Sequence, residues 1–266
     1  MYQQHFGLTH FPFETTIHPD SLFASSTLGE VQARLKHLIE LRAIGLITGE
    51  SGCGKSTACR QLADGLHPGL YRLFYVTLTT GSVMDIYKTI AWELGLSDER
   101  NRAAAFRSIR TEITRLTIES KQHPILIVDE AHHLRNDVLE ELRLLTNYQM
   151  DSEHRLTLIL VGLTELRRRL RMTVHESLAQ RIVVRFHLAG LARDELAGYL
   201  THRLRLAGCE LPLFEPPAIE VLFQATQGMP RKINRLAHYA LTCAAADKQQ
   251  TVTANHLETA LEDITL

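Results

Sequence analysis

The sequence contains few cysteines, no surplus of charge of either sign and no long apolar run. Its four cysteines form no CxxC pair and no metal-binding spacing, so a reduced, cytoplasmic setting is the simplest interpretation. No apolar stretch approaches the ~20 residues of a membrane span, and no basic-then-apolar leader is present. We therefore expect no membrane partner. The formal net charge of −1 does not by itself predict a polyanionic partner.

The chain has 266 residues, of which 45% are hydrophobic, which is enough for one large domain or for one domain and a smaller companion. Its basic residues are unevenly distributed. Between Thr164 and Arg205 nine arginines accompany four acidic residues, and four of these arginines form a cluster: Arg167, Arg168, Arg169 and Arg171. The cluster is compatible with a solvated helix face with structural ion pairs, and equally with a patch that faces nucleic acid or a partner.

The most informative motif is a match to the phosphate-binding pattern GxxxxGK[ST]. It comprises Gly49, Glu50, Ser51, Gly52, Cys53, Gly54, Lys55 and Ser56, and Thr57 follows it. An apolar run (44–47) precedes the motif and a helix-like stretch (57–66) follows it. Glycines let the backbone wrap around a polyphosphate, and the amides at a helix N-terminus attract its charge. Lys55 would reach the β- and γ-phosphates and Ser56 would hold Mg²⁺, so the motif predicts binding of a nucleoside triphosphate.

Over the first 190 residues, short apolar runs alternate with longer amphipathic ones, which is typical of a parallel sheet flanked by helices. The expected strands are 43–48, 72–78, 124–129, 156–161 and 182–188. The expected helices are 28–42, 54–65, 83–94, 103–120, 136–149 and 165–170. After Gly190 only helical segments are expected, at 192–207, 216–227, 230–246 and 253–263. We therefore expect an α/β nucleotide-binding domain (43–190), an N-terminal strap and first helix that belong to it (1–42), and a small helical lid domain (191–266).

A second motif is the apolar run Ile125–Val128 followed by Asp129 and Glu130. Ligands of parallel sheets bind beyond the carboxyl ends of the strands, so this run would bring a carboxylate to the same edge as the phosphate-binding loop. Asp129 would hold Mg²⁺ through water, and Glu130 would polarise the attacking water. The pair of motifs therefore favours hydrolysis over binding alone.

Two further groups of residues allow only weaker interpretations. The N-terminal aromatics Phe6, Phe11, Phe13 and Phe23 lie in a segment without periodicity, where we expect an extended strap that packs in the core; contact with adenine near Pro12-Phe13 is the less favoured alternative. His132 and His133 are adjacent. On a helix they would point about 100° apart, which makes a poor pair of zinc ligands.

Over essentially its whole length, the layout of the chain resembles the AAA+ ATPase family. The strand end Val161–Thr164 resembles the sensor 1 site, which assigns Thr164 to inspection of the γ-phosphate. Leu178–Ile182 resembles the segment that carries the arginine finger, so Arg181 would reach the γ-phosphate of a neighbouring subunit; an intramolecular salt bridge is the alternative. Gly228–Arg231 resembles the sensor 2 motif, which would place Arg231 over the bound phosphates; a solvated arginine at a helix start is the alternative.

A narrower likeness is to the ExeA-like ATPases. It rests on Tyr2, Phe6-Gly7-Leu8, Pro12-Phe13, Pro19-Asp20, Phe23, the Gly49 motif and Asp129-Glu130-Ala131. That group merges with the transposition regulators TnsC, TniB, MuB and IstB. Secretion proteins of the group continue with a membrane helix and a cell-wall-binding region, neither of which this sequence contains, so we expect the transposition branch.

The resemblance implies an ATP- and Mg²⁺-dependent oligomer, a ring or a helical filament, that binds double-stranded DNA. It would regulate transposition by recruiting a transposase, together with a target-selection protein, to target DNA. One alternative is an accessory ATPase of secretion or envelope assembly. Another is a P-loop switch that forms oligomers and hardly hydrolyses ATP.

In AAA+ rings, the loop after the second strand and the following helix line the central channel. The resemblance therefore implies that the DNA contacts are made by Thr79, Thr80, Ser82 and Lys88, with Arg100 and Arg102 in the next loop. Hydroxyl groups and amides bind phosphate oxygens without reading bases, so such binding would be sequence-tolerant and sensitive to salt. An ordinary strand-to-helix turn with Ser82 as the N-cap is the alternative.

Overall fold

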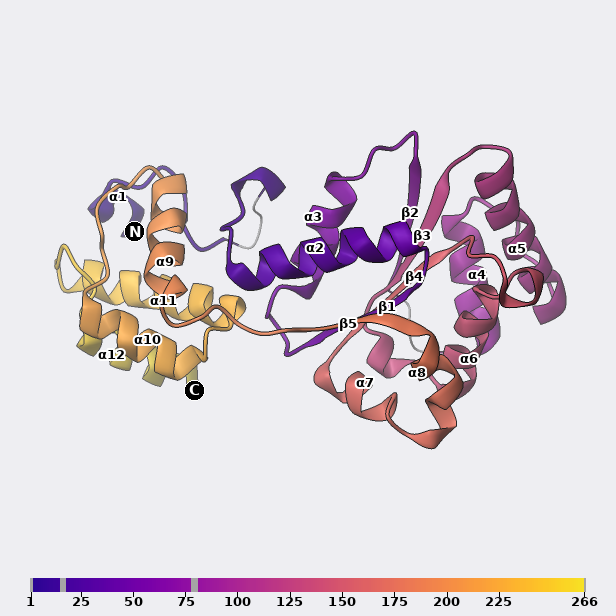
Figure 1. Ribbon diagram of the computed structural model, residues 1–266. Helices are drawn as coiled ribbons and strands as arrows, with labels where there is room; N and C mark the ends of the chain where they lie inside the picture. Colours follow the sequence, from indigo (N-terminus) through magenta and orange to yellow (C-terminus); the bar gives the residue numbers. More distant parts are fainter. Residues whose placement is uncertain (1, 15–17, 78–80, 266) are drawn as a thin grey trace. The chain divides into compact units, whose positions relative to one another are not determined.

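Five parallel strands form one sheet with the order β2-β3-β4-β1-β5 (Figure 1). The strands are β1 (Ile44–Gly49), β2 (Tyr71–Val76), β3 (His123–Val128), β4 (Thr157–Gly162) and β5 (Ile182–Leu188). The computed structural model describes residues 2–14, 18–77 and 81–265. It confirms the predicted parallel five-stranded sheet flanked by helices.

Six of the helices that accompany the sheet lie close to the expected ranges, and a seventh, α8 (Glu176–Arg181), was not predicted. The six are α2 (Ser26–Leu41), α3 (Lys55–Asp64), α4 (Val83–Glu93), α5 (Arg102–Ile118), α6 (Asn136–Leu145) and α7 (Thr164–Arg169). Three single 3₁₀ turns connect them, η2 (Ala131–His133), η3 (Gln149–Asp151) and η4 (Thr173–His175). Sequence periodicity did not predict these turns, because three residues are too few to establish a period.

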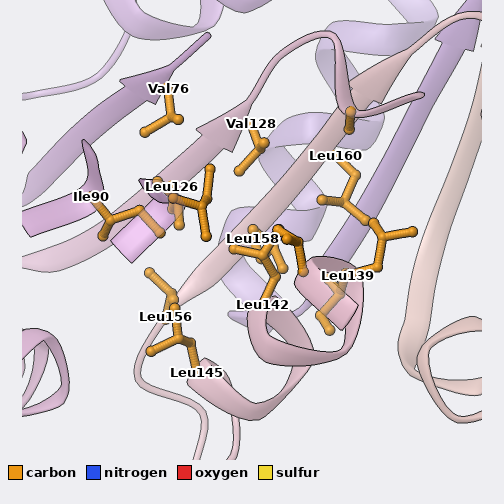
Figure 2. Close-up of a cluster of buried hydrophobic side chains, with 14 of the residues drawn as sticks. Val76, Ile90, Leu126, Val128, Leu139, Leu142, Leu145, Leu156, Leu158 and Leu160 are labelled. Atoms are coloured by element: carbon orange, nitrogen blue, oxygen red, sulfur yellow. The ribbon is translucent and has the colours of Figure 1, made fainter. Parts of the chain in front are cut away.

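The burial of each strand follows its position in the sheet. Every residue of the three central strands β1, β3 and β4 is buried, whereas the edge strands β2 and β5 include exposed residues. Figure 2 shows side chains of β2, β3 and β4 in a cluster with leucines of α6 and Ile90 of α4. The apolar run Ile125–Val128 is therefore central and covered on both faces, as parallel sheets require.

Contacts between Cα atoms divide the chain into two compact units. The sheet unit comprises residues 30–51 and 55–188, and the helical unit comprises residues 1–29, 52–54 and 189–266. The helices after the sheet are α9 (Glu195–Leu206), α10 (Pro216–Thr226), α11 (Pro230–Ala246) and α12 (Ala254–Thr265), so the expected C-terminal helices are present. We expected residues 1–42 to accompany the ATPase domain, but residues 1–29 group with these C-terminal helices.

The N-terminal aromatics explain this grouping. A short helix, α1 (Tyr2–Phe6), lies in the segment that we expected to be extended, and it packs on α11 (Figure 1). Tyr2, Phe6 and Phe13 are buried in the core of the helical unit, and the Tyr2 hydroxyl lies 2.9 Å from Nδ1 of His238. Core packing is thus confirmed for these rings. A 3₁₀ turn, η1 (Pro19–Ser21), completes the segment.

A buried arginine holds the strap to the helical unit. Arg203 on α9 is 3% exposed, and its guanidinium donates to the carbonyl oxygens of Pro12 and Glu14, each at 2.7 Å.

Within the described ranges of the chain, no helix combines the length and apolarity needed to cross a membrane.

Candidate nucleotide-binding site

The phosphate-binding motif lies at the junction of β1 and α3. β1 ends at Gly49 and α3 begins at Lys55, so the loop leads directly into a helix N-terminus. Gly52 and Gly54 have φ angles of +79° and +108°, which residues with a Cβ rarely adopt. Lys55 is 7% exposed, and its Nζ donates to the carbonyl oxygens of Gly49 (2.9 Å) and Glu50 (3.0 Å). The ammonium group is therefore held in the loop that would surround a polyphosphate.

Asp129 follows β3 directly and is 4% exposed. Both of its carboxylate oxygens accept hydrogen bonds. The backbone N–H of Glu130 donates to Oδ1 (2.8 Å), while the hydroxyls of Tyr75 (2.5 Å) and Ser56 (3.3 Å) donate to Oδ2. The structure thus brings together Ser56 and Asp129, the two residues that the sequence predicts for Mg²⁺. A carboxylate and a hydroxyl are hard oxygen donors, and Mg²⁺ is commonly bound by one or two such groups together with phosphates and waters, so these residues fit the ion.

Glu130 lies beside this cluster with its side chain half exposed (49%). Its backbone is left-handed, with φ +52° and ψ +30°, at the start of η2. Such a conformation is unfavourable for a residue other than glycine and often marks a functional position. The Glu130 carboxylate is therefore accessible to solvent next to Asp129. ATP hydrolysis would need a water-activating residue at this place.

The surroundings also affect Cys59 and Tyr75. Burial, with a further contribution from the Asp129 carboxylate, raises the pKa of the Cys59 thiol to about 12, so this cysteine is not a reactive thiolate. Burial and the hydrogen bond to Asp129 raise the pKa of Tyr75 well above its ordinary value, so its hydroxyl remains protonated and acts as a donor. Tyr75 was not among the site residues predicted from the sequence. Its only signal in the sequence was its place within the predicted strand 72–78.

The rings of His132 and His133 lie closer together than we expected for adjacent residues of an α-helix. They lie on the 3₁₀ turn η2, with ring centroids 4.0 Å apart, and with Glu130 they offer ligand atoms within 4.8 Å of one another. However, the Leu163 N–H donates to Nδ1 of His132 at 3.4 Å. Burial, reinforced by the charge of His133, lowers the pKa of His132, so the buried ring is neutral and helps to join η2 to the end of β4.

Thr164 begins α7, two residues after the last residue of β4. Its hydroxyl donates to Oε1 of Glu50 in the phosphate-binding loop at 2.6 Å. Pairing of β1 with β4, in which Thr48 faces Gly162, brings these segments together. The residue predicted as sensor 1 therefore lies at the rim of the loop and is held by it.

Arg181 is the last residue of α8, and its guanidinium forms a 2.7 Å ion pair with Asp151. The intramolecular salt bridge that we considered as the alternative is thus formed, and any contact with a neighbouring subunit would have to replace it. Arg231 lies in the first turn of α11, with an exposed side chain, and its backbone N–H donates to the Gly52 carbonyl at 3.2 Å. The arginine-finger and sensor 2 assignments stay predictions.

Three of the predicted DNA contacts have intramolecular partners among the described residues. Ser82 is the N-cap of α4 in a capping box with Asp85, the role that the alternative interpretation gave to this residue. Lys88 pairs with Asp98 at 3.7 Å, and Arg102 donates to the buried Glu141. Arg100 is exposed. Thr79 and Thr80 lie outside the described residues.

The arginine cluster divides into two roles. Arg169 donates to the carbonyl oxygens of His132 (2.6 Å) and Leu134 (2.7 Å) and so fixes the segment after Glu130. Arg167 and Arg171 instead line a cavity of about 650 Å³, together with Arg185 of β5. Part of the cluster is therefore structural, and part borders a cavity with a basic wall.

Comparisons with known proteins agree with this geometry. The family model described as "AAA domain" matches residues 39–170. General secretion pathway protein A of Aeromonas hydrophila is 35% identical over 92% of this chain and 45% of its own length. The ATP-dependent target DNA activator B of Escherichia phage Mu is 28% identical over 54% of this chain and 42% of its own length. This chain therefore spans less than half the length of the curated relatives it matches.

A solved structure supports the fold. Cdc6p from Pyrobaculum aerophilum superposes with a TM-score of 0.70 over 95% of this chain and 70% of its own, at 13% identity. The sheet order, the phosphate-binding loop and the matched domain define an AAA+ ATPase. Within that class, the relatives of the chain fall in the group that unites ExeA-like secretion ATPases and phage-type transposition regulators, as the sequence resemblance implied.

Proposed function

We propose that this protein binds and hydrolyses ATP with Mg²⁺ beyond the carboxyl ends of β1 and β3. The observation that carries the proposal is the meeting of Ser56, from the phosphate-binding helix, with Asp129, next to the exposed Glu130. When bound, Mg²⁺ would supply charge neutralisation on the β- and γ-phosphates. Lys55 would bind the same phosphates, and the N–H groups of the loop would orient them. Glu130 would accept a proton from the attacking water.

We propose that Thr164 acts as sensor 1 and Arg231 as sensor 2 at the phosphates. Thr164 is tied to the loop through Glu50, and a γ-phosphate that drew the threonine hydroxyl away would free that glutamate. Arg181 would complete the site of a neighbouring subunit after exchanging Asp151 for a phosphate. ATP would then join subunits, and hydrolysis would separate them.

We further propose that the ATP-bound oligomer binds double-stranded DNA and regulates transposition by recruiting a transposase. The relatives named ATP-dependent target DNA activator B support this role. The net charge is −1 and several candidate contacts are already paired, so one subunit would neutralise few phosphates and bind weakly at physiological salt. Assembly would multiply these contacts through effective concentration.

Electron microscopy of the protein with linear DNA, with and without ATP, tests the proposal. We expect ATP-dependent, cooperative assemblies that disappear at high salt and with Lys55→Ala. Arg100→Ala combined with Lys88→Ala should weaken DNA binding while sparing nucleotide binding, and Lys36→Ala, on the exposed face of α2, is the matched control. Tight DNA binding by the nucleotide-free monomer would contradict the scheme.

A role in secretion or envelope assembly is the second candidate, because the relative that matches 92% of the chain is a general secretion pathway protein. In that role the ATPase would act on protein assembly and not on DNA. The absence of DNA binding in every nucleotide state, with normal hydrolysis, would favour it.

A further inference from the structure

Tyr75 contacts the site through a hydrogen bond that the nucleotide-binding motifs do not include. It is the next-to-last residue of β2, and its hydroxyl donates to Oδ2 of Asp129 at 2.5 Å. Tyr75 is 38% exposed, and its ring lies on the face of the sheet that also presents Asp129. Hydrogen bonds of a neutral donor to a carboxylate are stronger than those between neutral groups.

The strand register explains why a tyrosine makes this contact. In the parallel pairing of β2 with β3, Tyr75 faces Ile127, and Asp129 lies two residues further along. Side chains two residues apart on a strand share one face and are separated by about 6.6 Å. A phenol spans that step, whereas serine or threonine at position 75 would fall short and phenylalanine would lack the donor.

The hydrogen bonds fix the orientation of Asp129. The Glu130 N–H holds Oδ1 at 2.8 Å and Tyr75 holds Oδ2, so the carboxylate cannot rotate without losing a bond. The same Oδ2 accepts from Ser56 at 3.3 Å. A serine oxygen that binds a cation must direct its hydrogen elsewhere, and Asp129 Oδ2 is the acceptor placed to take it.

We infer that Tyr75 is a positioning residue for the divalent cation that accompanies the nucleotide: it orients Asp129, and through Asp129 it orients Ser56. The inference rests on the proposed magnesium site at these two residues, and it does not depend on DNA binding or on transposition. Outer-shell partners of metal ligands commonly change metal affinity by about 10- to 100-fold when they are removed.

The test is the Mg²⁺ dependence of nucleotide binding in Tyr75→Phe, followed with a fluorescent ATP analogue. We expect the Mg²⁺ concentration for half-maximal tightening to rise about tenfold or more. Nucleotide affinity in EDTA should stay within about twofold, because the loop and Lys55 are untouched. Tyr71→Phe, at the opposite end of the same strand, is the matched control and should leave both values unchanged. Thermal unfolding of both variants establishes that they are folded.

A double-mutant cycle separates positioning from a general packing effect. In an Asp129→Asn background, Tyr75→Phe should cause no further loss of Mg²⁺ dependence, because the carboxylate that it orients is gone. An unchanged Mg²⁺ dependence in Tyr75→Phe, or an equal loss with and without Mg²⁺, overturns the inference and leaves the magnesium site standing. If the unaltered protein binds nucleotide equally well with and without Mg²⁺, the magnesium assignment fails and the inference fails with it.

Discussion

Replacing Glu130 by glutamine tests the catalytic assignment most directly. The amide has the same shape as the carboxylate but cannot accept the proton of the attacking water. The side chain is half exposed, and the His132 ring, whose Nδ1 lies 3.5 Å from the carboxylate, is neutral because burial lowers the pKa of His132. We therefore expect the free energy of unfolding to change by no more than about 0.5 kcal/mol. Turnover should fall by about a hundredfold or more, which corresponds to roughly 2.7 kcal/mol in the activation barrier.

Steady-state ATP hydrolysis, together with sizing in ATP, measures both consequences. The variant should retain ATP and accumulate as the assembled form, because only hydrolysis would dissolve it. Glu153→Gln is the matched control, since that carboxylate is exposed to a similar degree (47%) but lies away from Asp129. Unchanged turnover in Glu130→Gln would refute the role of Glu130, and so would an equal loss of turnover in the control.

The left-handed backbone at Glu130 gives a second, independent measurement. A glycine adopts φ +52° without the steric cost that an alanine meets there. The left-handed conformation costs a residue with a Cβ about 1–2 kcal/mol, and the greater freedom of glycine in the unfolded chain offsets part of this. The free energy of unfolding of Glu130→Gly should therefore exceed that of Glu130→Ala by roughly 0.5–1 kcal/mol, although both lack activity. Chemical denaturation measures the difference, and an alanine variant that equals or exceeds the glycine variant in stability would contradict the backbone assignment.

Three further predictions concern other residues. Lys55→Ala should abolish nucleotide binding, and near-normal ATP affinity in a fluorescence titration would argue against the phosphate-binding role. The Arg181→Ala monomer should still bind ATP, but assembly-dependent hydrolysis should be lost. If the arginine acts in trans, mixing this variant with Glu130→Gln should restore some ATPase activity. No rescue would mean that the role of Arg181 is the ion pair with Asp151. Burial lowers the pKa of His123 to about 4. The contribution of the neutral ring to stability is therefore fully present above about pH 6.5 and is lost as the pH drops from about 6.5 towards 4. The free energy of unfolding should fall by up to about 3 kcal/mol over this range. His123→Asn should flatten this part of the stability curve, and an unchanged slope would show that other groups cause it.

The sequence predicted the sheet well, because the pattern of fully apolar runs directly reflects strands that are buried on both faces. It also predicted that Ser56 and Asp129 meet, since parallel strands bring their carboxyl ends to one edge. It could not predict Tyr75, because that contact depends on the register between β2 and β3, which no local pattern specifies. The short helix α1 was missed for a related reason: five residues give no reliable period, and its aromatics are fixed by distant helices.

The resemblance to AAA+ rings suggested DNA contacts that the local structure uses differently. Ser82 and Arg102 have partners that stabilise α4 and Glu141, respectively. Residue type alone does not predict this pairing. A serine before a helix can cap the helix or contact a ligand, and an arginine after a loop can pair with a carboxylate of its own chain or contact a ligand. Arg181 is a further case, in which Asp151 lies 30 positions away and reaches it only in the folded chain.

The two long stretches of the helical unit, residues 1–29 and 189–266, are separated by about 160 residues. Translation adds roughly 5–20 residues per second, so these partners emerge on the order of ten seconds or more apart. Throughout that interval Tyr2, Phe6 and Phe13 have no α11 to pack against, while the sheet unit between them can already be completed. During synthesis, the aromatic N-terminal segment is therefore an exposed apolar sequence that depends on late-made helices for its burial, and a ribosome that stalls after residue 188 leaves it unprotected.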